Sequence, residues 1–253
     1  MCCSCNGNKK YLKYLKCLLS SMDANSIDTV CDIRLVNCKN IDDLKIDKRH
    51  YIRIDNKLLN SKLHINHVGS HLTKGITHLL TKNRKEPWGV YTTEVFYTCM
   101  IKYDTIYKLL SEYNTVIYLD VDTIIRAKLC EHLHEVRDAD IALYFDEDQE
   151  DFPHAGLIVA NRSSRTKECM RYMKTHFDRC ITSGDIKIGE GDGDLLYSKC
   201  VDFDMNIKRL SNRWKDEGPV FSESSIMWSG RSNNKKDSEQ YIKEYNRYKD
   251  EHR

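Results

Sequence analysis

The feature that most constrains this chain is a short apolar run that ends at two aspartates. Thr115-Val116-Ile117-Tyr118-Leu119 is followed directly by Asp120-Val121-Asp122. A continuous β-branched and apolar run of this length predicts a strand buried on both faces, as in the parallel sheet of an α/β protein. Because open α/β sheets bind ligands beyond the carboxyl ends of their strands, the two aspartates are the first candidates for a functional site.

The segments around this run alternate between strand and helix patterns. Strands are expected at 1–4, 28–38, 51–54, 141–145 and 155–160, and helices over 10–22, 93–111, 130–136 and 166–180. Such alternation is typical of a mainly parallel sheet flanked by helices. We therefore expect one α/β domain over 1–232, with a loop and one short helix within 60–90. A charged tail over 233–253 is expected to be helical or solvated.

Charge and cysteine usage narrow the functional classes. Lys and Arg total 40 against 38 Asp and Glu, a formal charge of +2, which gives no basic footprint for a nucleic-acid partner. No apolar run approaches the roughly 20 residues of a transmembrane segment, and the first residues lack a signal-peptide pattern. The 11 cysteines are scattered through apolar patterns. They predict packed, reduced thiols and a cytoplasmic location.

Asp120 and Asp122 carry a metal-binding hypothesis. Residues i and i+2 of an extended chain point to the same side, so the two carboxylates can share a cation that relieves their repulsion. Oxygen ligands suit Mg²⁺ or Mn²⁺, and a diphosphate supplies further oxygen ligands. Such an ion would stabilise the charge on a departing nucleoside diphosphate.

Four motifs, in order, resemble glycosyltransferases of the GT-A fold, including glycogenin and bacterial lipopolysaccharide galactosyltransferases. The motifs are Cys5-Asn6-Gly7-Asn8, Tyr118-Leu119-Asp120-Val121-Asp122, His154-Ala155-Gly156-Leu157-Ile158-Val159-Ala160-Asn161 and Gly191-Asp192-Gly193-Asp194-Leu195-Leu196. They resemble the family's nucleotide-binding turn, D-x-D element, N-A-G segment of the sugar pocket and later D-Q-D-x-L element. The resemblance covers roughly residues 1–235.

This resemblance implies a Rossmann-like GT-A domain and a hexosyl- or pentosyltransferase. The implied donor is a nucleoside diphosphate sugar, with UDP-sugars first, the acceptor is a glycan or another hydroxyl compound, and the cofactor is Mn²⁺ or Mg²⁺. Small stand-alone enzymes of this kind occur in bacteria and in large DNA viruses.

The resemblance also implies roles for individual residues. Asp120 and Asp122 would bind the metal, and Asp192, or alternatively Asp194, would lie nearest the acceptor hydroxyl or the anomeric carbon. That carboxylate would act as a base in an inverting enzyme or stabilise positive charge in a retaining one. The residues implied for the sugar pocket are His154, Ala155 and Gly156, and those expected near the nucleotide and its phosphates are Asn6, Arg53, Asp55, Lys102, Asp120 and Lys235. For Lys235 a solvated tail is an equal alternative.

Three positions depart from the family pattern. His154 stands where Asn is usual, Gly193 where Gln is usual, and Ser229 where many members carry a metal-binding His. With Ser229 in that place, the metal is expected to be held mainly by the aspartates and the diphosphate.

Two other functions stay open on the sequence alone. Asp120-x-Asp122 after an apolar strand also fits the opening motif of haloacid-dehalogenase-like phosphatases, in which Asp120 would be the nucleophile and Asp122 a general acid. That nucleophile normally lies near the start of its domain, whereas 119 residues precede Asp120. The second alternative is a non-catalytic nucleotide-sugar-binding domain, which Gly193 and Ser229 motivate.

Overall fold

A computed structural model gives the three-dimensional structure of the chain. The structure describes residues 1–7, 9–36, 38, 46–55, 64–66, 93–145, 153–183, 185–187, 192–218, 220–229 and 239–250. Lys235, the acidic loop at 146–151 and most of the stretch 60–90 lie outside the described residues.

The main sheet has seven strands in the order β10-β7-β8-β5-β1-β2-β3. Its strands are β1 (Cys2–Asn6), β2 (Asp32–Val36), β3 (Tyr51–Asp55), β5 (Thr115–Leu119), β7 (Ile141–Phe145), β8 (Pro153–Asn161) and β10 (Ile207–Leu210). Two small sheets pair β6 (Thr123–Ile125) with β11 (Met227–Ser229) and β4 (His64–Asn66) with β9 (Asp185–Lys187). In the main sheet β8 is antiparallel to β5 and β7, and the other pairs are parallel. The expected mainly parallel α/β sheet is confirmed.

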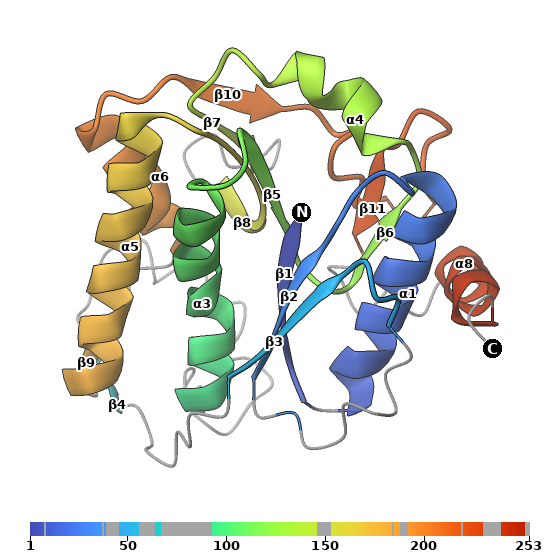
Figure 1. Cartoon of the computed structure of the whole chain (residues 1–253), viewed down its shortest axis with the longest axis horizontal. Coiled ribbons are helices and arrows are strands. Elements are labelled where there is room, and N and C mark those ends of the chain that lie inside the picture. Colours follow the sequence, from blue (N-terminus) through green and yellow to red (C-terminus); the bar gives the residue numbers. More distant parts are fainter. Residues whose placement is uncertain are drawn as a thin grey trace, which may run out of the picture.

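Helices cover both faces of this sheet (Figure 1). They are α1 (Lys9–Asn25), α3 (Thr93–Leu109), α4 (Leu129–His132), the 3₁₀ turn η1 (Leu133–Glu135), α5 (Ser164–Ser183), α6 (Asp192–Asp202) and α8 (Glu239–Asp250). In Figure 1, α3 and α5 lie side by side on one face, and α1 lies on the other with α8 outside it. No helix in the described ranges is both long and apolar enough to cross a membrane.

The middle strand, β5, joins the two hydrophobic cores. Val116 and Tyr118 belong to the core beneath α3 and α5, whereas Ile117 and Leu119 belong to the core beneath α1. All four are buried. Because successive side chains of a strand point to opposite faces, a run that is apolar at every position can fill both cores.

Several expected boundaries differ from the structure by a few residues, and the backbone hydrogen bonds explain two of these differences. β1 continues to Asn6, because its full length pairs with β2. The strand expected at 28–38 is shorter, since Thr29 N bonds Ser26 O in a turn and β2 begins only at Asp32. The cysteines are free thiols, with Cys99 and Cys130 exposed and the other nine buried.

The charged C-terminal segment contains a packed helix. Tyr248 of α8 is 3 % exposed, and Asn25 Nδ2 of α1 donates a hydrogen bond of 2.9 Å to its hydroxyl. Tyr245 meets Tyr14 of α1 edge to face, with 6.2 Å between the ring centroids. One aromatic face of α8 is therefore part of the fold.

Replacing Tyr248 tests this packing. Tyr248→Ala should lower the free energy of unfolding by roughly 3 kcal/mol, as for other buried aromatic side chains. Urea denaturation measures the change, and Lys243→Ala, at an exposed position of the same helix, is the matched control. Equal stability of the two variants would mean that α8 does not contribute to the folded domain.

Candidate functional site

The candidate site begins where β5 ends. Asp120 N donates to Gly156 O of β8 at 2.9 Å, and Thr123 N donates to Asp120 O at 3.2 Å. The two aspartates therefore lie in a tight turn between β5 and β6 rather than on the extended chain that the sequence predicted. Asp120 is exposed and Asp122 is partly exposed. They still interact, because the charge of Asp122 raises the pKa of Asp120.

Tyr118 connects this turn to β1. Its hydroxyl donates to Asp120 Oδ1 at 3.3 Å and lies 2.9 Å from Ser4 Oγ, which is placed to donate to it. Tyr118 is 2 % exposed, and burial raises the pKa of its phenol. A neutral phenol thus orients one oxygen of the Asp120 carboxylate.

Lys102 brings α3 and α6 into the same site. Its Nζ donates to Ala155 O at 3.0 Å and forms an ion pair with Asp192 Oδ2, the first residue of α6. The side chain is only 4 % exposed, and Nζ lies 5.4 Å and 5.3 Å from the ring centroids of Tyr103 and Tyr118. Burial disfavours the ammonium, but the nearby charges of Asp192 and Asp120 outweigh it and raise the pKa of Lys102.

The charges around Asp120 have both signs. Desolvation by the surrounding protein raises its pKa, Lys102 and Lys215 lower it, and Asp122 and Asp192 raise it. The net pKa of Asp120 is raised even though its side chain is exposed. Both observations fit a carboxylate that has protein on one side and solvent on the other.

Lys215 is a member of this site that the sequence did not indicate. It lies after β10, with its side chain 7 % exposed and its Nζ 3.1 Å from Glu217 Oε1. The same ammonium is 5.3 Å from the centroid of the Tyr144 ring, which in turn is 5.6 Å from the ring of His154. Trp-Lys-Asp-Glu matches no motif, so only the fold identifies this buried cation near Asp120.

Two glycines let the elements of the site approach one another. A Cβ on Gly156 would lie 2.3 Å from Asp120 Oδ2, and a Cβ on Gly193 would lie 2.2 Å from Pro153 O of β8. Any side chain at position 193 would therefore push α6 away from β8. The close packing of α6 on β8 therefore explains why position 193 is Gly, where the sequence comparison with GT-A enzymes expects Gln.

The donor set of the turn fits a hard divalent cation. Asp120 and Asp122 supply carboxylate oxygens on one turn, and a cation between them would relieve the repulsion that raises the pKa of Asp120. Ser229, 3 % exposed, pairs with Thr123 and so lies beside the same turn. No group of three or more His, Cys, Asp or Glu side chains in the described part of the chain is arranged to hold a metal ion. A metal ion held by these two carboxylates would therefore need further oxygen ligands from a bound molecule or from water.

Comparison with solved structures identifies the architecture. Over 98 % of this chain and 96 % of that chain, it matches galactosyltransferase LgtC in complex with donor and acceptor sugar analogues, with a TM-score of 0.51 and 13 % identity. Mouse xyloside xylosyltransferase 1 matches over 92 % of this chain and 97 % of that chain, with a TM-score of 0.50 and 11 % identity. This is the GT-A glycosyltransferase fold.

A third match has the same fold in a longer protein. The glycosyltransferase GlyE of Streptococcus pneumoniae matches over 98 % of this chain and 60 % of that chain, with a TM-score of 0.54 and 12 % identity. No protein-family model matches the chain, and comparison with curated protein sequences gives no match either. At these identities the shared property is the GT-A fold, which is the fold that the sequence motifs implied.

Within the GT-A domain, the residues predicted for the metal and the sugar come together. The contacts described above join six of these residues, namely Asp120, Asp122, Lys102, Asp192, Ala155 and Gly156. Asp194 lies on the same turn of α6 as Asp192, and burial, followed by the charge of Asp192, raises its pKa. His154 is on β8 beside Tyr144.

The residues predicted for the nucleotide are spread more widely. Asn6 is the last residue of β1. Arg53 and Asp55 lie on β3 at the sheet edge, where Arg53 Nε donates to Asp32 Oδ2 at 2.8 Å and the Tyr97 hydroxyl donates to Asp55. The structure thus directs Arg53 toward the amino ends of the strands and not toward Asp120. Lys235 lies outside the described residues.

The two close-approach glycines are expected to differ in how well they tolerate replacement by alanine. In an ordinary helix Gly→Ala stabilises by about 1 kcal/mol, but Gly193→Ala should destabilise by roughly 1–3 kcal/mol because its Cβ meets a backbone oxygen. Gly156→Ala should cost less, since the clashing atom belongs to a side chain that can rotate. Urea denaturation of the two variants provides the comparison. Stabilisation by Gly193→Ala would contradict the packing of α6 on β8.

Proposed function

We propose that this GT-A domain is a metal-dependent glycosyltransferase that moves a sugar from a nucleoside diphosphate sugar, with UDP-sugars as the first candidates, to a hydroxyl of a glycan or another acceptor. The observation that carries the proposal is one juxtaposition. The turn with Asp120 and Asp122 faces the Lys102–Asp192 ion pair, with the backbone of Ala155 and Gly156 between them.

In this proposal Asp120 and Asp122 hold Mn²⁺ or Mg²⁺, and the diphosphate completes the coordination. The ion supplies positive charge where the leaving diphosphate becomes more negative. The Tyr118 hydroxyl keeps one Asp120 oxygen directed, so the carboxylate reaches the metal in a defined orientation.

Lys102 fixes the carboxylate that would face the reacting sugar. Its ammonium holds Asp192 Oδ2, while Asp192 Oδ1 accepts from Gly193 N at 3.0 Å. A carboxylate held at both oxygens is suited to bind sugar hydroxyls or to stabilise positive charge at the anomeric carbon. Asp194, whose pKa is raised by burial and by Asp192, is the better base of the two for an acceptor proton.

We propose separate sides of the sheet for the donor and the acceptor. The nucleotide is proposed at the carboxyl ends of β1, β2 and β3, which include Asn6 and Asp55. The acceptor is proposed on the side of β7 and β8, near His154 and Tyr144. His154 is half-buried against the buried ring of Tyr144, and the accessible part of its ring can pack against the apolar face of a sugar.

Thermal unfolding with ligands tests the metal and donor proposal. UDP with Mn²⁺ at about 100 times its dissociation constant should stabilise the fold by about 2.7 kcal/mol, a rise of several degrees in Tm. Asp122→Ala should remove the manganese-dependent part of that gain. Asp138→Ala, at a side chain 91 % exposed and remote from the turn, should keep it.

The readouts separate the remaining functions. Donor hydrolysis, followed by mass spectrometry, should accompany binding in an enzyme, whereas binding without turnover would indicate a non-catalytic domain. Phosphate release from a simple phosphate ester that Asp120→Asn abolishes would indicate the phosphatase instead. A manganese-dependent gain that persists in Asp122→Ala would disprove the metal assignment.

Lys215 should contribute to donor binding as a second buried cation. Lys215→Met removes the positive charge near Asp120 and keeps much of the side-chain volume, so UDP binding with Mn²⁺ should weaken about tenfold, in the range of one charged hydrogen bond. Isothermal titration calorimetry measures the affinity. Lys208→Met removes the same charge at an exposed position of β10 and should leave the affinity unchanged, whereas equal affinities in the two variants would exclude Lys215 from the site.

A further inference from the structure

We propose that the chain has a second carbohydrate-binding site, in a cavity toward the amino ends of the parallel strands. The cavity has a volume of about 390 Å³, and its lining includes Tyr51, Tyr113, Asp32, Arg53 and Glu112. This second site rests on the proposed glycosyltransferase function only for the expectation that its natural ligand is a glycan. Oligosaccharide binding can be measured whether or not the chain transfers sugars.

The stagger of the sheet creates this cavity. Cys2, the first residue of β1, is level with Asp32 of β2 and with Tyr118 of β5. Because β5 already begins at Thr115, its first residues extend past the start of β1 and leave a gap between β5 and β2. Thr115 and the loop before β2 line that gap. The cavity is therefore built by strand register and does not depend on a single loose loop.

Two exposed tyrosines stand at the cavity. Tyr51, the first residue of β3, is 57 % exposed, and Tyr113, which follows α3, is 44 % exposed. Large aromatic side chains normally gain by burial, and here each offers an accessible ring beside a concave surface. Sugar rings present apolar C–H faces that stack on such rings, so the pair can hold a saccharide without covering its hydroxyls.

Planar polar groups complete the lining. Asp32 is 3 % exposed, and its Oδ2 accepts from Arg53 Nε at 2.8 Å. This bond orients the guanidinium, whose Nη groups form no hydrogen bond to the described residues. Arg53 can thus donate two parallel hydrogen bonds, a geometry that matches adjacent hydroxyls of a sugar. Glu112 at the same cavity can accept from hydroxyl groups.

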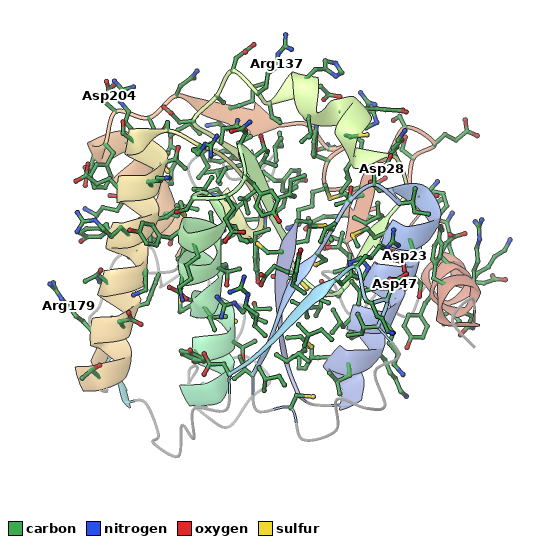
Figure 2. All side chains as sticks on the ribbon, viewed as in Figure 1. Asp23, Asp28, Asp47, Arg137, Arg179 and Asp204 are labelled. Atoms are coloured by element: carbon green, nitrogen blue, oxygen red, sulfur yellow. The ribbon has the colours of Figure 1, made fainter. Side chains whose placement is uncertain are left out.

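The balance of charge favours a neutral polyhydroxyl ligand. Carboxylates of Asp28, Asp32 and Glu112 lie around the guanidinium of Arg53 and the α-ammonium of Met1, so the lining has no excess of positive charge to attract a strongly anionic ligand such as a nucleotide. Asp28, labelled in Figure 2, lies between the end of α1 and α4, where Lys128 Nζ is 3.6 Å from its Oδ2. Apolar walls with a few directed polar groups are typical of small-ligand sites.

The cavity is distinct from the candidate active site. Its lining contains neither Asp120, Asp122, Lys102 nor Asp192. Thr115, Val116 and Ile117, at the start of β5, line the cavity, whereas Asp120 follows the end of that strand. A glycan bound here would leave the turn after β5 open, which suits a subsite that retains one part of a long acceptor while another part reacts.

Binding to an array of immobilised neutral and acidic oligosaccharides tests the proposal. The native chain should bind neutral members of the array. Tyr51→Ala and Tyr113→Ala should each weaken binding to the best member about tenfold, and Tyr51→Phe and Tyr113→Phe should largely retain it because the ring face is kept. Both positions are exposed, so the variants should fold, and their melting temperatures verify this.

Control variants separate this site from the catalytic proposal. Asp122→Ala should keep array binding, and the tyrosine variants should keep the manganese-dependent stabilisation by UDP. Binding to no oligosaccharide would overturn the second site. Binding that is lost in Asp122→Ala but kept in the tyrosine→Ala variants would also overturn it, because the glycan would then lie only at the end of β5.

Two exposed cysteines report on the two regions within one molecule. Cys130 lines the cavity, whereas Cys99 lies within electrostatic reach of Asp192 and Asp120. The best oligosaccharide from the array should slow alkylation of Cys130 and leave Cys99 unaffected, as peptide mass spectrometry can show. Protection of Cys99 alone would argue against the second site.

Discussion

The hydrogen bond from Asp120 N to Gly156 O holds the functional region together. It continues the antiparallel pairing of β5 with β8 by one residue beyond β5 and fixes the point at which the chain turns toward β6. The same pairing places Ala155 O within reach of Lys102 and brings Pro153 against Gly193. One antiparallel strand inserted into a mainly parallel sheet thereby positions a carboxylate turn, a buried lysine and the start of a helix.

Each lysine that is buried near Asp120 has an acidic partner. Lys102 is nearly inaccessible and would be costly to bury alone, but Asp192 and the Ala155 carbonyl satisfy it. Lys215 is satisfied in a similar way by Glu217. Each lysine is thus held rigidly near Asp120. Rigid charges stabilise a developing anion better than mobile ones, because they need no reorientation when the charge appears.

Much of this arrangement could be predicted from residue patterns, for identifiable physical reasons. The run Thr115–Leu119 fills two cores, so its apolar pattern is unambiguous, and the motif order indicated the GT-A fold. The strand expected from residue 28 was too long, because β-branched Thr29 and Val30 favour a strand locally while Thr29 is bonded into a turn. The extended geometry expected for Asp120 and Asp122 was wrong, since the chain turns immediately after Leu119.

Other features could not be predicted because they depend on distant contacts. Lys215 resembles an ordinary surface lysine in the sequence, and only the packing of the loop after β10 buries it. Lys102 was expected near the phosphates, but its burial and its ion pair with Asp192 depend on where α3 and α6 lie in the fold. Arg53 was expected near the nucleotide because it lies near the end of the third strand, where similar enzymes hold the uridine or ribose. Its direction is set by Asp32, a residue of the neighbouring strand that carries no motif.

The pairing of β11 with β6 and of α8 with α1 has a consequence for how the protein is made. A ribosome releases the amino-terminal strands first, and domains generally begin to fold in that order. Here the strand that supports the turn after β5, β11, and the helix that covers α1, α8, both follow the strands of the main sheet in the chain. A nascent chain can therefore assemble its central sheet first, and it acquires the support beneath its two aspartates only after Ser229, the last residue of β11, has been synthesised.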